Sequence, residues 1–495
     1  MFENKARRAL ACPLLMLAII SLPTSVLAQV ARGSPPAANP PSSAPQVSTP
    51  EAIGLKIGTD AAAAADQPVR PPKAGEPAPA AAAPVDQRWA IHGQATFVDQ
   101  GTLPFRSPYR GPNSLDAGAR GRETIDATVY LGFKPWTGAE IWVNQEVDQG
   151  FGLNDTLGAA GFPSAEAYKV GKSDPYLRLQ RAFIRQTLDL GGERETADPD
   201  QNQFGGSRTA DRLVFTVGKF GAVDIFDNNR FAHDPRGDFL NWSVDDTGSF
   251  DYAADAWGYT VGAAAEWYQG QWTVRAAVFD LSDVPNSTTL DGRFSQFQLV
   301  GELERRFKIA GRDGKVEVTG FLSRGRMGTY ADAIAAAGGG APDTASVRRY
   351  ASRPGVSANL EQRLTDHLGF FARAGVSNGD YETYEFTDID ASVAAGLSLS
   401  GDRWGRKDDT VALAVVQNEI SKIHRQYLAD GGLGVLIGDG RLPHYGPERI
   451  VEAYYTAAVS KALKITFDGQ VIDNIAYNRD RGPAAILAVR LHAQL

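Results

Sequence analysis

The residues best suited to chemistry in this sequence gather in segment 221–253, where acidic, basic and aromatic side chains lie close together. Arginine and aspartate side chains hydrogen-bond hydroxyl groups, and an aromatic ring stacks on the C–H face of a sugar ring. A loop of this composition that narrows a water-filled passage would favour polar, neutral solutes. The alternative is that Asp–Arg pairs only brace the folded loop. The candidates in this segment are Asp224, Asp227, Arg230, His233, Asp234, Arg236, Asp238 and Trp242.

A second group of charged residues lies on two neighbouring segments with strand-like alternation. Arg178 has one parity along its strand, whereas Arg181 and Arg185 have the other, so all three can point inward only across a β-bulge. In a membrane-spanning strand, an arginine on the lipid face would cost about 2–4 kcal/mol at the midplane. We therefore expect Arg178 to face Glu140 or Glu146 as a charge pair inside the protein.

No enzyme motif is present. The sequence lacks H-E-x-x-H, G-x-S-x-G and P-loop patterns, and the glycine-rich segment 431–440 has no strand–helix context for phosphate binding. The six histidines do not pair at metal-ligand spacing on one strand, so we expect no catalytic metal and no cofactor. The acidic segments 381–390 and 245–246 offer oxygen ligands suited to Mn²⁺. A solvated acidic loop is the simpler interpretation of both.

The N-terminus has the pattern of an export signal. Residues 1–28 join a basic start, a short apolar run and the small-residue end Val26-Leu27-Ala28. The single cysteine, Cys12, lies in this segment, so the exported chain would have neither disulfide nor thiolate chemistry. Loss of three basic residues and one acidic residue would change the net charge from −8 to −10, opposite in sign to that of a typical nucleic-acid binder.

Two further regions follow the signal. Residues 29–87 are rich in proline and alanine and nearly free of aromatics, which predicts a disordered periplasmic spacer. Residues 88–495 contain no apolar stretch as long as a transmembrane helix. If this domain lies in a membrane it must be a closed barrel, because only helices and closed barrels satisfy every backbone polar group in lipid.

Apolar and polar residues alternate along most of residues 88–495, which indicates half-buried strands. In 462–472, for example, Leu463, Ile465, Phe467 and Val471 share one face, opposite the polar side chains. Most such segments have about the ten residues that a tilted strand needs to cross a bilayer. The sixteen segments are 88–99, 121–133, 138–147, 177–188, 211–220, 254–267, 271–280, 294–307, 314–323, 354–363, 367–377, 391–400, 410–417, 448–459, 462–472 and 484–495.

The connections alternate between mostly short and mostly long, although 189–210 is a longer member of the short set. Outer-membrane barrels show this rhythm, with short periplasmic turns and long external loops, whereas a soluble sandwich explains only the alternation. The last strand is amphipathic but ends in Leu495 rather than in an aromatic residue. We predict an all-β fold: a sixteen-stranded antiparallel transmembrane β-barrel with long external loops. Segments 148–176 and 221–253 are the candidate constriction loops.

Long, particular strings in the predicted barrel resemble carbohydrate-selective porins of the OprB type. The resemblance implies a sixteen-stranded outer-membrane channel through which sugars and other small hydrophilic solutes diffuse without an energy source. The chain is also similar to alphaproteobacterial relatives described as manganese porins. The strings are HGQATFVDQG (92–101), FRSPYRGPNSL (105–115), GAEIWVNQEVDQGFGLNDTLGAAGFPSAEAYKVG (138–171), PYLRLQRAFIRQT (175–187), VGKFGAVDIFDNNRFAHDPRGDFLNWS (217–243), DYAADAWGYTVGAAAEWYQGQW (251–272) and AYNRDRGP (476–483).

Three hypotheses from different classes follow. A passive porin of a Gram-negative outer membrane is favoured, with sugars or, alternatively, Mn²⁺ as the permeating solute. A barrel enzyme and a surface adhesion barrel are the others, and bilayer conductance separates them from the first. The expected partners are outer-membrane lipid, the barrel-assembly machinery and small solutes, without nucleic acid; the sequence specifies no number of subunits.

Overall fold

The computed structural model describes residues 87–118 and 122–495. The predicted signal peptide 1–28 and all but the last residue of the predicted spacer 29–87 lie outside the described residues. Within the described part, the chain from Trp89 to Gln494 forms the barrel domain.

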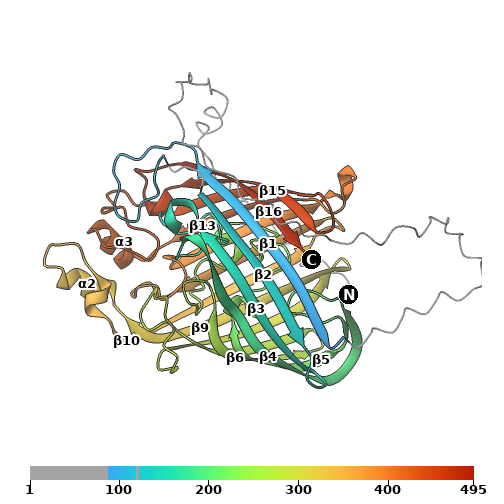
Figure 1. The fold of residues 1–495 in the computed structure, drawn as a ribbon. Helices are drawn as coiled ribbons and strands as arrows, with labels where there is room; N and C mark the ends of the chain where they lie inside the picture. Colours follow the sequence, from blue (N-terminus) through green and yellow to red (C-terminus); the bar gives the residue numbers. More distant parts are fainter. Residues whose placement is uncertain (1–86, 119–121) are drawn as a thin grey trace, which may run out of the picture. The chain divides into compact units, whose positions relative to one another are not determined.

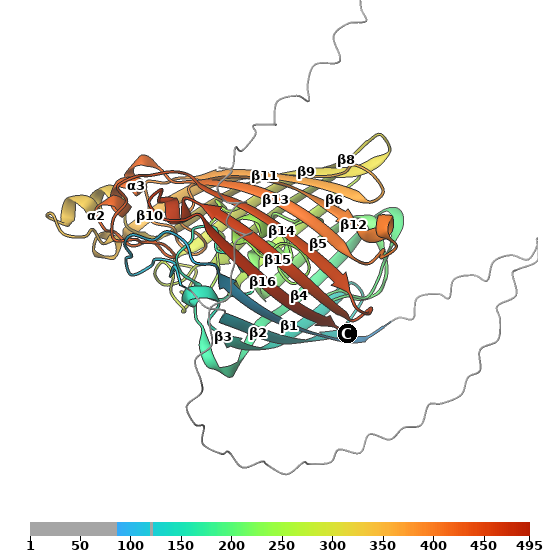
Figure 2. The ribbon, with the colours of Figure 1, turned by 90° about the horizontal axis from the view of Figure 1, so that it is seen from above.

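Sixteen antiparallel strands in the described residues close into a barrel, as predicted (Figures 1 and 2). Each strand pairs with its neighbours in sequence, and β1 closes the barrel against β16, with Phe97 opposite Leu491. The strands are β1 (Trp89–Thr102), β2 (Arg122–Phe133), β3 (Ala139–Gly150), β4 (Lys172–Ala197), β5 (Gly206–Phe220), β6 (Thr260–Gln269), β7 (Trp272–Asp280), β8 (Phe297–Ile309), β9 (Arg312–Met327), β10 (Arg349–Arg363), β11 (Leu368–Ser377), β12 (Ala391–Ser400), β13 (Thr410–Glu419), β14 (Glu448–Ala458), β15 (Leu463–Asp473) and β16 (Ala484–Gln494).

The alternation of apolar and polar residues in the sequence corresponds to side chains that point alternately out of and into the barrel. In β15, Leu463 and Phe467 are exposed on the outside, whereas Thr466, Asp468 and Gln470 are buried inside. Most strands expose apolar side chains outward and bury polar side chains inward, although apolar residues such as Trp142, Phe371 and Ile450 are also buried inside. This inverts the usual soluble pattern and is the arrangement that a barrel in lipid requires.

One end of the barrel carries the short turns, and we call it the short-turn end; the other is the long-loop end. Five of the eight tryptophans are exposed at or near the short-turn end. Amphipathic indole rings gather where hydrocarbon meets headgroups, so these residues mark one boundary of the lipid belt. They are Trp89, Trp136, Trp267, Trp272 and Trp404.

Short helices occupy the connections, and α2 and α3 lie at the long-loop end (Figure 1). Side chains cap them: Thr329 accepts from the Asp332 N–H of α2, and Ser421 from the His424 N–H of α3. Within the described residues no helix is long and apolar enough to cross a membrane. The helices are η1 (Leu153–Thr156), η2 (Ala222–Asp224), α1 (Trp242–Asp245), α2 (Tyr330–Ala336), η3 (Thr344–Val347), η4 (Gly401–Trp404), α3 (Lys422–Ala429) and η5 (Ile475–Tyr477).

One element departs from the sequence prediction. Segment 189–210, predicted as a connection, is largely strand, because β4 and β5 continue pairing well beyond the rim of the barrel. Beyond the rim β4 and β5 still pair with each other, but neither strand has a face toward lipid. The alternation of apolar and polar residues that marks the other strands is therefore missing there. Arg194, for example, lies opposite Thr209, and both are polar.

Candidate functional site

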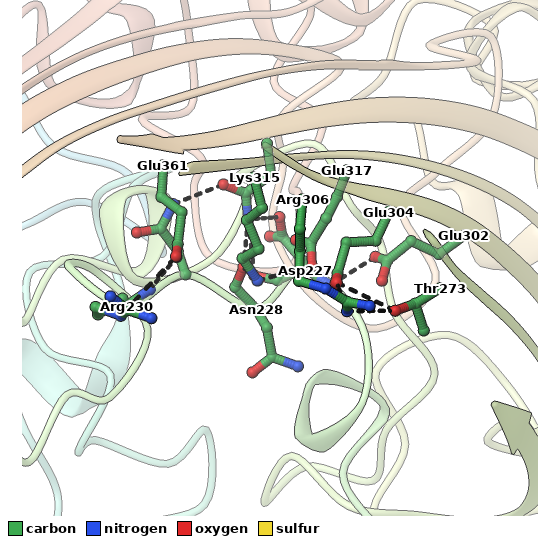
Figure 3. Close-up of polar contacts among 12 residues, drawn as sticks. Asp227, Asn228, Arg230, Thr273, Glu302, Glu304, Arg306, Lys315, Glu317 and Glu361 are labelled. Atoms are coloured by element: carbon green, nitrogen blue, oxygen red, sulfur yellow. Dashed lines mark hydrogen bonds and ion pairs between the residues drawn. The ribbon is translucent and has the colours of Figure 1, made fainter. Parts of the chain in front are cut away.

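The connection between β5 and β6, residues 221–259, folds into the barrel, and the inner wall holds its first half (Figure 3). The Asp227 N–H donates to Glu302 of β8 at 2.9 Å, and the Arg230 N–H donates to Glu361 of β10 at 2.7 Å. Lys315 Nζ of β9 donates to the Asn228 carbonyl at 2.7 Å. Charge-assisted hydrogen bonds of this kind are strong, so the wall fixes the backbone of the loop.

The second half of the loop is held by another part of the wall, β14, and by the connection between β3 and β4, residues 151–171. Glu452 of β14 accepts from the Leu240 N–H at 2.5 Å. The Trp242 N–H donates to Phe162 O at 2.9 Å, and the Trp242 ring stacks on Phe386. Gly161 allows this close approach, because a Cβ there would lie 2.5 Å from Ser243 Oγ. The two predicted constriction loops therefore pack together inside the barrel.

Two cavities in the described part of the chain flank the inward-folded loop. The outer cavity, of about 300 Å³, lies toward the long-loop end. The inner cavity, of about 1210 Å³, opens toward the short turns and includes the turn 134–138 in its wall. The same four side chains line both cavities, so the cavities meet there and we call this place the junction. The junction residues are Gln201, Asn202, Asp224 and His233.

Asp224 at the junction pairs with Arg181 of β4. The guanidinium donates through Nε at 2.7 Å and through Nη2 at 2.5 Å to the two carboxylate oxygens. Burial would raise the pKa of Asp224, but the Arg181 charge and hydrogen bonds outweigh it and lower the pKa below its ordinary value. The Arg181 guanidinium also lies 4.8 Å from the ring centroid of Tyr259, which places an aromatic face beside the pair.

His233, the other loop residue at the junction, lies with Nδ1 3.5 Å from Asp246 Oδ1. Burial would lower the pKa of this imidazole, but the neighbouring Asp246 carboxylate raises it. Burial and the neighbouring Asp246 carboxylate raise the pKa of Asp245 well above the ordinary value of a carboxyl group. Both aspartates line the outer cavity.

Arg236 joins the loop to the barrel wall beside the outer cavity. Its guanidinium lies 3.2 Å from Asp126, 3.4 Å from Glu146 and 3.4 Å from Glu166. Burial opposes its charge, but the surrounding carboxylates raise the pKa of Arg236 well above its ordinary value, so it remains a cation. Burial raises the pKa of Glu166 well above the usual range, and the Asp126 charge adds to the increase.

The three arginines of β4 correct one prediction. A bulge at Gln180, where Leu179 faces Gln145 and Arg181 faces Asn144, lets residues of both parities point inward. Arg178 does not pair with Glu140 or Glu146: it pairs with Asp255 at 3.0 Å and lies over Trp257. The register places it opposite Glu146, but the inward-folded loop brings Asp255 within reach.

The remaining sequence candidates divide by position. Asp234, Arg236 and Trp242 line the outer cavity, whereas Glu140 and Arg185 line the inner one and pair with each other at 3.5 Å. The others line neither cavity and brace the loop or its surroundings. These are Glu146, Arg178, Asp227, Arg230 and Asp238. Burial and the Asp234 carboxylate raise the pKa of Asp238 to about 6.

The two cavities differ in charge. Among the described residues that line the outer cavity, seven are acidic and three are arginine or lysine. Among those that line the inner cavity, seven are arginine or lysine and four are acidic. The two cavities therefore form an acidic chamber and a basic chamber that share the junction residues, whose side chains are of mixed charge.

Sequence reasoning missed part of this lining. The amides of Gln201 and Asn202 lie in a segment that looked like a plain connection, and nothing local distinguishes them. Tyr130 and Arg275 lie on inward positions of their strands, so the alternation placed them inside without indicating that they line the passage.

Acidic side chains of segment 381–390 form ion pairs with basic side chains of the same chain. Glu382 binds Arg348 through both carboxylate oxygens at 2.8 Å, and Asp390 lies 3.3 Å from Arg353 and 3.1 Å from His424. Within residues 87–118 and 122–495, no group of three or more His, Cys, Asp or Glu side chains is arranged to hold a metal ion.

A closed sixteen-stranded barrel with an apolar outside, a polar inside and loops folded into its lumen defines a porin-type transmembrane channel. A profile of the carbohydrate-selective porin, OprB family, matches residues 113–495. The chain therefore belongs to the OprB family of porins, which places it in the outer membrane of Gram-negative bacteria.

A solved structure shares the fold. Pseudomonas putida OprB at high pH matches with a TM-score of 0.61 and 14% identity over 82% of this chain and 94% of that chain. The outer membrane channel DcaP of Acinetobacter baumannii gives a TM-score of 0.47 and 9% identity over 82% of this chain and 97% of that chain. No curated protein sequence matches the chain.

Proposed function

We propose that this porin passes small neutral polyols, above all sugars, by diffusion through the outer cavity, the junction and the inner cavity. The observation that carries the proposal is the junction: a carboxylate held by an arginine, an imidazole and two amides, with aromatic rings close by. These groups offer donors and acceptors that replace the water around a hydroxylated solute.

The aromatic part of the outer cavity supports a sugar in particular. A sugar ring has an apolar C–H face that an aromatic ring covers, while its hydroxyl groups need polar partners at the edge. The outer cavity presents both kinds of surface within one chamber. Its aromatic lining consists of Tyr130, Tyr168, Trp242, Tyr252, Trp257, Tyr259 and Phe386.

The charge of the outer cavity adds a weak preference for cations over anions. Its lining has more acidic than basic residues, and the resulting potential is screened beyond about 8 Å at physiological salt. Paired arginines reduce the field, so the preference is modest. A selective route for Mn²⁺ is the alternative, with Asp245 and Asp246 as the acidic groups that face the passage.

The test joins single-channel recordings in planar bilayers with swelling of liposomes in sugars of increasing size. We expect an open channel that passes monosaccharides faster than trisaccharides, and whose current sugars block in part. Exclusion of sugars combined with a channel-dependent uptake of Mn²⁺ would replace this proposal by the manganese one. A barrel that folds and conducts nothing would favour an enzyme or an adhesin.

A further inference from the structure

The hairpin of β4 and β5 extends beyond the barrel at the short-turn end. β3 begins at Ala139, opposite Gln186, and β6 pairs with β5 only as far as Arg212, opposite Tyr268. Beyond these points the two strands pair only with each other as a ribbon that turns back toward the barrel (Figure 1). A free two-stranded ribbon is marginally stable in water, so its position depends on what holds its end.

The end of this ribbon, residues 197–206, which we call the hairpin tip, has an aromatic anchor in the barrel mouth. Phe204 is buried, and its ring centroid lies 4.9 Å from that of Trp142 on β3. Lys134 Nζ lies 4.6 Å from the centroid of the same ring. Gly132 makes room for the anchor, because a Cβ there would lie 2.7 Å from Trp142 and 2.9 Å from Phe204.

Polar contacts also hold the tip. They come from β1 and β16, which close the barrel, and from β4 at the base of the ribbon. The hydrogen bonds run from Gln201 Nε2 to Gln94 Oε1 (2.6 Å), from Gln494 Nε2 to Asp200 Oδ1 (3.1 Å) and from Arg185 Nη1 to Asn202 O (2.9 Å). The tip is therefore a fixed part of the mouth rather than a free end.

The fixed tip brings two amides to the junction. Gln201 and Asn202 line both cavities, as do Asp224 and His233 from the inward-folded loop. Asn202 has φ 53°, a left-handed conformation that asparagine tolerates better than most residues, and its Oδ1 has no hydrogen-bond partner in the described part of the chain. An element from the short-turn end thus meets one from the long-loop side at the junction.

We propose that the hairpin tip is the inner half of the constriction, and that Gln201 and Asn202 set the size and the hydroxyl recognition of the solutes that pass. A neutral amide donates and accepts hydrogen bonds without adding charge, which suits a neutral polyol that must also leave. The proposal rests on the channel function proposed above and adds a second selective element to the loop.

The first experiment removes the two amides and leaves the anchor. The double variant Gln201→Ala/Asn202→Ala should raise single-channel conductance and increase the swelling rate with a trisaccharide relative to a monosaccharide by about twofold or more, because a narrow passage discriminates steeply by size. Thr196→Ala is the matched control, since Thr196 lies on the same ribbon, is exposed and lines neither cavity.

The second variant, Phe204→Ala, removes the anchor and leaves the amides. It should give the same loss of size discrimination, together with greater current noise as the ribbon moves, while heat-modifiable gel migration shows that the barrel is folded. If both variants conduct and sort sugars as the parent does, the tip is not part of the constriction. If the parent itself does not conduct, the channel function fails instead, so the two failures are distinguishable.

Discussion

Asp224 and His233 are the residues through which the loop reaches the junction, and they show what sequence reasoning can and cannot find. Their types predicted a polar, mixed-charge segment, and the segment does fold into the lumen. Their neighbours Asp227 and Arg230 have the same types but brace the loop through backbone N–H groups. The difference depends on which way each side chain points after the loop has folded, which composition does not encode.

The Arg181–Asp224 pair gives a prediction on charge selectivity. Asp224→Asn leaves an unpaired arginine at the junction and should lower the ratio of cation to anion permeability, whereas Arg181→Gln leaves the carboxylate and should raise it. Reversal potentials in a salt gradient measure the ratio. Arg230→Gln is the control, because Arg230 lines neither cavity. Equal ratios in all three variants would place the ion path elsewhere.

The titrating groups of the outer cavity give a prediction on pH. Burial and the Asp246 carboxylate raise the pKa of Asp245, so this group keeps its proton where an ordinary carboxyl group has lost it. As the pH rises, Asp245 becomes negative only above the range of an ordinary carboxyl group, and His233, whose pKa lies above its ordinary value, becomes neutral. Both changes make the cavity more negative, so cation preference should increase.

Reversal potentials recorded while the pH is raised stepwise test the expectation. Asp245→Asn should reduce the increase, because the substitution removes one of the two groups that titrate. A cation preference that falls as the pH rises would show that the charges counted in the outer cavity do not face the ion path.

At the scale of elements, the alternation of apolar and polar residues along the sequence predicted all sixteen strands and their lipid-facing sides. The pattern is local, since each strand meets lipid on one face and the lumen on the other. It could not predict that β4 and β5 continue past the rim, because the ribbon has no lipid face there. Nor could the pattern predict the ion pair between Arg178 and Asp255, because that pair depends on the folding of a distant loop.

The register of β15 can be tested with one outward position near the middle of the strand. Phe467 is exposed on the lipid side, so Phe467→Arg should destabilise the folded barrel by about 2–4 kcal/mol, whereas Phe467→Leu should change little. Urea titration of the protein in lipid vesicles gives the free energy of unfolding. Equal stability of the two variants would mean that this face does not meet the hydrocarbon.

The inward neighbour Thr466 is not a free position, although the alternation alone suggests that Thr466→Arg is tolerated. Its hydroxyl group hydrogen-bonds Thr456 at 2.8 Å and accepts from Arg490 at 3.1 Å. An arginine there would meet Arg490 in a filled part of the lumen. The inward face is therefore packed at this position, and a substitution here is constrained by neighbouring side chains rather than by lipid.

For the whole molecule, the acidic outer cavity and the basic inner cavity define a polarity along the passage. A pore with charges of opposite sign at its two ends conducts unequally in the two directions, because one voltage sign accumulates ions in it and the other depletes them. We predict rectification in low salt that weakens in high salt, where screening is stronger. Planar-bilayer current–voltage curves in both salts check it, and symmetric curves at low salt would contradict it.

The central claim is that solutes and ions pass through the junction, and one measurement tests it most directly. Cys12 is the single cysteine of the chain, so Cys12→Ser with His233→Cys leaves one thiol, at the junction. A bulky thiol reagent should reduce the single-channel current by about half or more, since it would occupy the junction that both cavities share, and should slow sugar-driven swelling. The same reagent on Ser460→Cys, exposed in a short turn, should change neither. Full labelling of residue 233 with an unchanged current would contradict the account.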